Sequence, residues 1–172
     1  MKANTLTFLL SLSILTSPQV LAKKNLGSHE HGSAKISLSY ENKAAEIELD
    51  APADSIIGFE HAPKTDKEKK AFENAKGLWQ NLLIDLVVFP KELNCKINES
   101  EFKQELSGDK HEKNSHSEIE ASATIACEKN ITGDIAVMFR KQFKKMKNVK
   151  LEVVGAKSMS LKLKNDTEII KL

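Results

Sequence analysis

The chain has five histidines among its 172 residues, and the pair in the segment GSHEHGSAK has a spacing suited to binding a cation. His29 and His31 are two residues apart, so they would point to the same side of an extended segment. Two imidazoles on one side could chelate one metal ion. The opposing interpretation is a solvated N-terminal segment whose histidines share no role.

A third histidine lies in the segment IIGFEHAP, which reads as a shaped turn between a strand and a helix. Gly58 and Pro63 shape this turn, and we expect Glu60 and His61 at its tip. The alternative is a helix-entry histidine without a special role.

The last two histidines, His111 and His116, fall in or beside the polar segment SGDKHEKNSH. Their spacing is one residue longer than that of the helical zinc-protease motif, and it would place them on different faces of a helix. As a loop, the pair could still capture metal. His116 also precedes Glu118 by two residues at the start of an alternating run, so we expect these two side chains on one face of a strand.

Imidazole and carboxylate ligands together suit Zn²⁺, and also Cu²⁺ and Ni²⁺. The ligand types by themselves do not choose among these ions.

The elements that would carry these residues indicate an α+β fold with a mainly antiparallel β-sheet and two amphipathic helices. Alternating apolar residues predict a β-hairpin over residues 34–50 that ends at Pro52. Thr65 and Glu68 form a capping-box pattern before a helix that reaches about Asp85, with Trp79 in the core. A second helix is expected over residues 132–146, with an apolar stripe of Ile135, Met138, Phe139 and Phe143. The remaining strands are expected over residues 92–106, 117–129 and 149–172.

The N-terminus has the pattern of a secretory signal peptide in residues 1–22, with Lys2 before an apolar core and cleavage after Ala22. We therefore expect an exported, periplasmic protein whose residues 23–172 form a single domain. Without the leader, 25 basic residues face 24 acidic ones, so nucleic acid is not indicated as a partner. No later apolar run is long enough for stable insertion in a membrane.

The two cysteines, Cys95 and Cys127, each lie in a strand-like run of the exported part. In an oxidising compartment they are expected to form one disulfide, which would stabilise the fold by roughly 3–4 kcal/mol. A thiolate metal site or a redox pair is the alternative, but there is no CxxC spacing to support it.

The segments HEHGSAKISL, APADSIIGFEHAP, LNC, HSEIEASATIAC and VMFRKQF occur in an order that resembles the ZrgA family of periplasmic zinc-binding proteins. The resemblance covers most of the exported chain. It implies a protein that binds Zn²⁺ and assists an ABC-type zinc importer. It also implies that His29, His31, His61 and His116 are metal-binding positions, with Glu60 and Glu118 as helpers.

The chain departs from some members of this family in one segment. Their long insertion rich in His and Asp is reduced here to SGDKHEKNSH, which keeps His111 as one extra histidine. This departure weakens the case for a large secondary zinc-collecting role.

Two other classes of function compete with zinc binding. A metal-dependent hydrolase would use a zinc-bound water with Glu60 or Glu118 as base, but no GxSxG or GxGxxG motif supports an enzyme. An interaction module would use the basic run RKQFKKMKNVK to dock an acidic partner or an anionic membrane, whereas the plain interpretation of this run is a solvated helix face.

Overall fold

A computed structural model describes residues 31–107 and 116–172 of the chain, and within them nine strands form two sheets. In chain order the elements are β1 Ser33–Glu41, β2 Ala44–Pro52, α1 Ala53–Ile56, α2 Asp66–Gln80, α3 Leu82–Asp85, β3 Val87–Val88, a 3₁₀ turn Lys91–Leu93, β4 Lys96–Ser107, β5 His116–Ala126, β6 Asp134–Val137, α4 Phe139–Gln142, β7 Asn148–Val154, β8 Met159–Leu163 and β9 Glu168–Lys171.

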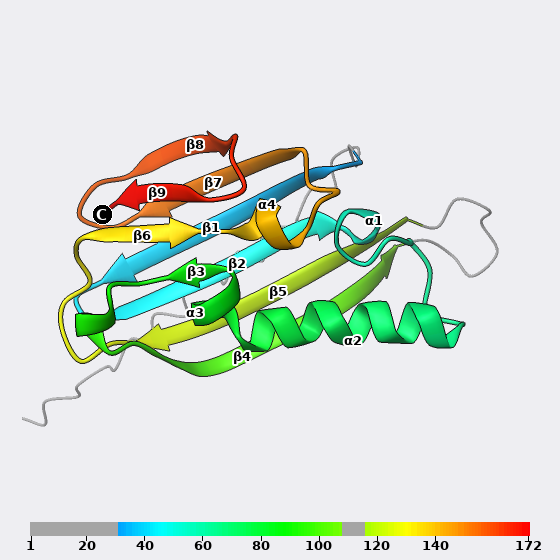
Figure 1. The fold of residues 1–172 in the computed structure, drawn as a ribbon, viewed down its shortest axis with the longest axis horizontal. Coiled ribbons are helices and arrows are strands. Elements are labelled where there is room, and N and C mark those ends of the chain that lie inside the picture. The colour runs from blue at the N-terminus through cyan, green and yellow to red at the C-terminus, as the bar shows by residue number, and fades with distance from the viewer. Residues whose placement is uncertain (1–30, 108–115) are drawn as a thin grey trace, which may run out of the picture.

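The larger sheet has six strands in the order β4-β5-β2-β1-β7-β8 (Figure 1). All neighbouring strands are antiparallel except β1 and β7, which run parallel. The predicted hairpin is confirmed as β1 and β2, which pair from Lys35 with Asp50 to Glu41 with Ala44. Asn42 turns the hairpin with a φ of 51°, a left-handed conformation that asparagine tolerates better than most residues.

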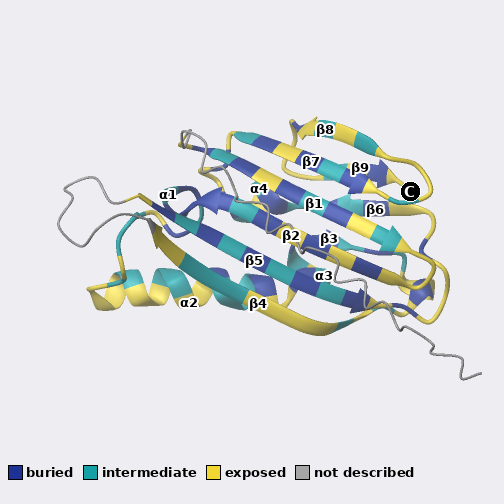
Figure 2. Cartoon of the chain, turned by 180° about the vertical axis from the view of Figure 1, so that it is seen from behind, coloured by how far each residue is buried: buried dark blue, intermediate teal, exposed yellow. Residues whose placement is uncertain are grey.

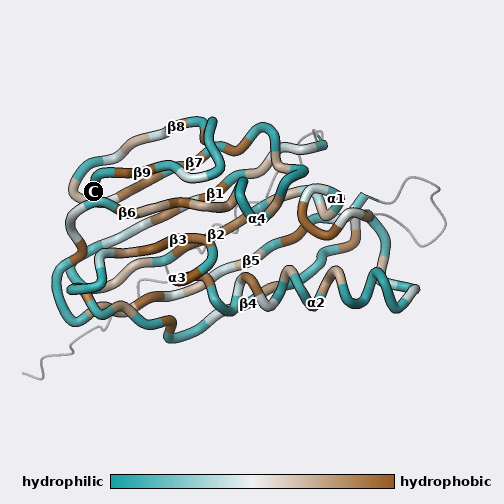
Figure 3. Tube along the Cα trace, in the orientation of Figure 1, coloured by the Kyte–Doolittle hydropathy of each residue, from teal (hydrophilic) through white to brown (hydrophobic). Residues whose placement is uncertain are grey.

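One face of the large sheet is covered by a second layer, which contains α2, α3 and the small sheet β3-β6-β9 (Figure 1). Trp79 of α2 is 0 % exposed and joins the layers, because its indole N–H donates to the carbonyl of Ser122 on β5 at 3.1 Å. Its ring centroid is 6.3 Å from that of Phe139. Hydrophobic residues run along β3 and β6 in this second layer (Figure 3).

The opposite face of the large sheet carries the exposed and half-buried positions of each strand (Figure 2). On β5 the predicted alternation is confirmed, since Ile119, Ala121, Ala123 and Ile125 are buried and the residues between them are not. This alternation is expected of a sheet with one face on the core and one face in solvent.

Helix α2 begins as the sequence predicts and ends earlier. The Thr65 side chain accepts from the Glu68 N–H, and the Glu68 carboxylate accepts from the Thr65 N–H, which completes the capping box. The helix stops at Gln80, and a break at Asn81 separates it from the single turn of α3. None of the described helices is long and apolar enough to cross a membrane.

The prediction of a mainly antiparallel α+β fold is confirmed, but the prediction of two amphipathic helices is not, since residues 31–107 and 116–172 form four α-helices. The expected helix over residues 132–146 is instead strand β6 followed by the single turn of α4. Ile135 and Val137 are buried, with Ala136 between them less so, which is the two-residue period of a strand. Pairing with β3 and β9 satisfies the backbone of β6, and this long-range pairing outweighs the helical spacing of the apolar residues.

Cys95 and Cys127 form the expected disulfide, which links the segment before β4 to the end of β5. Cys127 is buried and Cys95 is partly buried against the core, and neither sulfur is a free thiol.

We predict that Gly155→Ala destabilises the protein by about 1–3 kcal/mol, the usual cost of overpacking. A Cβ atom at Gly155 would overlap the ring of Tyr40, which packs against the core from β1. Urea unfolding measures the effect. Gly77→Ala is the control, because nothing lies within 4 Å of its added Cβ and helix propensity should raise the free energy of unfolding by about 0.5–1 kcal/mol. Equal stability of Gly155→Ala and the wild type would contradict the packing described here.

Candidate metal site

The strand pairing brings four parts of the chain to one end of the large sheet. β1 and β5 both pair antiparallel with β2, so their first residues lie beside the last residues of β2. β7 runs parallel to β1, and Asn148 at its start pairs with Ser33. The segments just before β1 and β7, the start of β5 and the loop after β2 therefore meet at this end.

Glu60, in the loop after α1, lies between two of the predicted histidines. Its Oε2 accepts a hydrogen bond from the Nδ1–H of His116 at 2.8 Å, and its Oε1 is 3.4 Å from Nδ1 of His31. The ring centroids of the two histidines are 6.4 Å apart. The structure thus brings together His31, Glu60 and His116, which are separated by up to 85 positions in the sequence.

The carboxylate of Glu60 is only 19 % exposed, and one of its oxygens is poorly satisfied. Oε1 is buried and accepts no hydrogen bond from the described residues. A buried anionic oxygen without a donor is unfavourable, and such an atom generally has a cation or an ordered water as a partner.

Gly32 holds His31 in place. Its φ of 82° is a conformation that favours glycine, and a Cβ there would lie 3.0 Å from the carbonyl oxygen of Lys145. Its N–H donates to the buried hydroxyl of Ser55 in α1 at 3.0 Å. Its carbonyl accepts from the N–H groups of Lys147 and Asn148 at 2.7 and 2.9 Å. His31 itself lies in a turn before β1 rather than on the strand.

Asp54 is a further acidic residue at this end of the sheet, and its spacing from the histidines in the sequence does not point to it. Its Oδ2 is 3.8 Å from Nδ1 of His31, and its Oδ1 forms an ion pair with Nζ of Lys145 at 2.9 Å. A signal in the sequence was its place in APADSIIGFEHAP, a segment that contributes to the family resemblance, two residues after the end of β2 at Pro52.

The side chain of His61 lies beside Phe59 and Glu68. Its Nδ1–H donates to the carbonyl of Ala62 at 2.9 Å, and its Nε2 is 3.6 Å from a carboxylate oxygen of Glu68. Its ring lies 5.2 Å from that of Phe59. Its backbone carbonyl accepts from the side chain of Gln104 at 3.1 Å. To bind a metal together with His31 and His116, His61 would have to leave these side-chain partners.

The other predicted site residues divide into two groups. Glu118 lies on the same face of β5 as His116, as the sequence predicts, and its backbone pairs with Pro52. His29 and His111 lie outside the described residues, so their positions relative to Glu60 are not part of this geometry.

As they stand, the described side chains include no group of three or more His, Cys, Asp or Glu arranged to hold a metal ion. Two imidazoles that share one Zn²⁺ through bonds of about 2.0–2.1 Å at a tetrahedral angle have ring centroids about 5 Å apart. The observed 6.4 Å is wider than this. His31 and His116 are 61 % and 47 % exposed, so side-chain rotation can bring them closer without disturbing the core.

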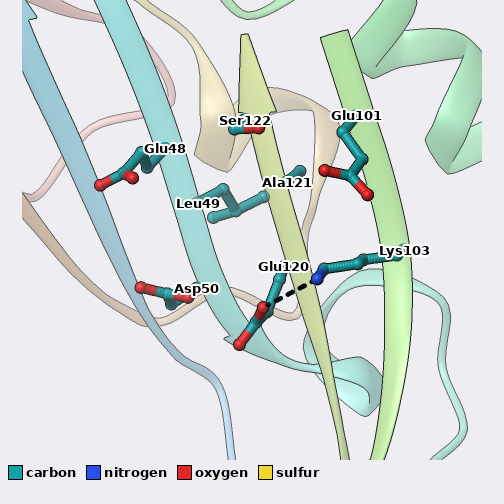
Figure 4. Close-up of a pocket in the computed structure, with 8 residues that line it drawn as sticks. All are labelled: Glu48, Leu49, Asp50, Glu101, Lys103, Glu120, Ala121 and Ser122. Carbon is teal, nitrogen blue, oxygen red and sulfur yellow. Dashed lines mark ion pairs between the residues drawn. The ribbon is translucent and has the colours of Figure 1, made fainter. Parts of the chain in front are cut away.

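A second polar feature lies on the open face of the large sheet, over β2, β5 and β4 (Figure 4). This hollow is lined by Glu48, Asp50, Glu101 and Glu120, with Lys103 among them. Lys103 forms ion pairs with Glu105 at 3.1 Å and Glu120 at 3.5 Å. The hydrogen bond to Glu105 is the main cause of a raised pKa of the Lys103 ammonium. The hollow contains no histidine and is a weaker candidate for a metal such as zinc.

The model of the family described as ZrgA family zinc uptake protein matches residues 28–172 of the chain. The matched part includes all five histidines and every element of both sheets. No curated protein matches the chain.

The hydrogen bonds that Glu68 accepts at the start of α2 should make the stability of the fold depend on pH. The N–H groups of Thr65 and Lys64 donate to Glu68 and are the main causes of its lowered pKa, and His61 adds to the effect. A lowered pKa in the folded state means that the charged form stabilises the fold above pH 4.5 and that this stability is lost as the pH falls through the folded pKa.

We therefore expect Glu68→Gln to be less stable than the wild type at neutral pH, with a difference that shrinks as the pH falls below 4.5. Urea unfolding at several pH values measures this, and Glu73→Gln on the same helix is the control. A difference that is constant down to acidic pH would contradict the assigned role of the charge.

Proposed function

The chain belongs to the ZrgA family of zinc uptake proteins, and we propose that it captures Zn²⁺ with His31, Glu60 and His116 and assists an ABC-type zinc importer. In this proposal it is a binding protein and not an enzyme. The leader in residues 1–22 would export it to the periplasm, where zinc must be collected before it can cross the inner membrane.

The observation that carries the proposal is the buried Oε1 of Glu60, which accepts no hydrogen bond from the described residues and lies 3.4 Å from Nδ1 of His31. Two imidazoles around a carboxylate provide ligands that Zn²⁺ prefers. A divalent cation at this position would also neutralise the negative charge of a mostly buried carboxylate.

Glu60 can support zinc in either of two ways. If it orients the histidines, it accepts their Nδ1–H groups and the lone pair of each ring is on Nε2, which then binds the metal. This carboxylate–histidine–zinc arrangement is common in zinc proteins. If it is a ligand itself, the rings turn so that one nitrogen of each faces the metal beside Oε1. The hydrogen bond from His116 at 2.8 Å favours the orienting role for Oε2.

A tetrahedral site needs a fourth position, which water or a further side chain can occupy. His29 is two residues before His31 in sequence, and His61 follows Glu60 directly, so both remain candidates, with Glu118 and His111 after them. The histidine side chains are about half exposed and must move to complete the coordination of zinc. Such a site suits a protein that must release the metal, because binding and release need only small motions of these side chains.

We predict that the exported chain, residues 23–172 without an affinity tag, binds Zn²⁺ in competition with a chromogenic chelator. His31→Ala/His116→Ala should abolish tight binding, because it removes both imidazoles beside Glu60. Glu60→Gln should weaken binding about 10- to 100-fold, as expected when a carboxylate that orients metal-bound histidines is removed.

Glu101→Gln is the matched control, because it removes one carboxylate from the open face of the sheet, where Glu101 pairs with Ser122 and not with the His116 end of β5. Thermal unfolding of each variant without zinc confirms that the fold is retained. His61→Ala tests whether His61 is a ligand, because only loss of a ligand should weaken zinc binding. Unchanged zinc binding by the His31/His116 double variant would refute the proposed site.

A further inference from the structure

Asp54 and Lys145 form an ion pair at the edge of the proposed metal site. The two oxygens of Asp54 have different partners, since Oδ1 is 2.9 Å from Nζ of Lys145 and Oδ2 is 3.8 Å from Nδ1 of His31. Asp54 is 30 % exposed and Lys145 is 56 % exposed, so both side chains can exchange partners without unfolding the surrounding chain.

Lys145 is held beside the site by its backbone as well as by this ion pair. Gly32, the residue after His31, accepts the N–H of Lys147, and its Cα faces the carbonyl of Lys145. The ammonium of Lys145 also reaches Gly58, where an added Cβ would be 3.8 Å from Nζ. Lys145 thus spans from the turn that carries His31 to the loop that carries Glu60.

Resting on the zinc-binding function proposed above, we propose that Asp54 is a second carboxylate of the metal site and that Lys145 is the cation with which zinc competes for it. In the metal-free protein the ammonium neutralises Asp54. When zinc binds, Asp54 turns toward the metal, and Lys145 loses its partner and repels the bound ion. Lys145 therefore lowers the affinity of the site and speeds release of the metal.

Removing Lys145 should change the zinc affinity in opposite directions if Lys145 competes with zinc and if it only holds Asp54 in place. An exposed ion pair contributes little to stability, so loss of Lys145 should not unfold the protein. If Lys145 only held Asp54 in place, its removal would weaken zinc binding. If it competes with zinc, its removal strengthens binding, because a positive charge near a divalent ion raises the energy of the bound state.

The test compares Lys145→Gln with Lys144→Gln in zinc competition titrations and in stopped-flow release to an excess of chelator. The control removes the same charge from the neighbouring residue, whose partner is Asp166 at 2.6 Å and not Asp54. We expect Lys145→Gln to bind zinc roughly three- to tenfold more tightly at low salt and to release it correspondingly more slowly. The gain should shrink as salt is raised, because ions screen the repulsion.

Asp54→Asn should weaken zinc binding, and Lys145→Gln should bring a smaller gain in the Asp54→Asn background than in the wild type. Lys145→Gln that binds no more tightly than Lys144→Gln would overturn the proposal, as would an Asp54→Asn variant with wild-type affinity.

Different results would overturn the proposed zinc binding and the proposed role of Lys145. If the wild type binds zinc through His31 and His116 but Lys145→Gln has no effect on affinity or release, only the role of Lys145 is overturned. If the wild type binds no zinc, the proposed function fails and the inference fails with it.

Discussion

The antiparallel pairing of β2 with both β1 and β5 is the constraint on which the candidate site depends. Because β2 runs against both neighbours, β1 and β5 begin at the end of the sheet where β2 finishes. Helix α1 carries Asp54 and the loop after it carries Glu60 to this same end, where His31 precedes β1 and His116 begins β5. A shift of one residue in either pairing would turn His116 to the other face of the sheet or move the β1 turn away from α1.

The rest of the fold keeps this register in place. The buried alternate residues of β1, β2 and β5 face the second layer, where Trp79 packs beside Phe139 and donates to the backbone of β5. The disulfide joins the opposite end of β5 to the segment that enters β4. The backbone at the site is therefore rigidly supported, whereas the side chains of His31 and His116 remain about half exposed. This combination of a fixed frame and movable ligands suits a protein whose family acts in zinc uptake.

Charge is unevenly arranged around the site. Glu60 supplies negative charge beside His31 and His116, Asp54 adds negative charge beside His31, and Lys145 offsets part of it. The open face of the large sheet is also acidic over β2, β5 and β4, but there Lys103 already pairs with two carboxylates, and no imidazole is present among the residues that line the hollow. The two areas differ because only the first has imidazoles and a buried carboxylate oxygen that accepts no hydrogen bond from residues 31–107 and 116–172.

Local patterns were sufficient for many of the elements. The capping box at Thr65 and Glu68, the hairpin, the burial of Trp79 and the alternation along β5 follow from spacing and short-range hydrogen bonding, which the sequence contains directly. Over residues 132–146 local spacing predicts the wrong element, because Ile135, Met138 and Phe139 also fit a helix. Only pairing with β3 and β9, which are distant in sequence, decided in favour of a strand.

By itself, then, the sequence determined the α+β class, the hairpin that follows His31, the strand that begins beside His116, the resemblance to a zinc-binding family and the residue types suited to zinc. Tertiary structure alone decided which of these residues meet. It placed Glu60 between His31 and His116, turned His61 toward Glu68 and brought Asp54 and Lys145 to the same end of the sheet. The physical reason is that these contacts depend on strand order and register, which are set by the burial of whole sheet faces and not by the local spacing of any one segment.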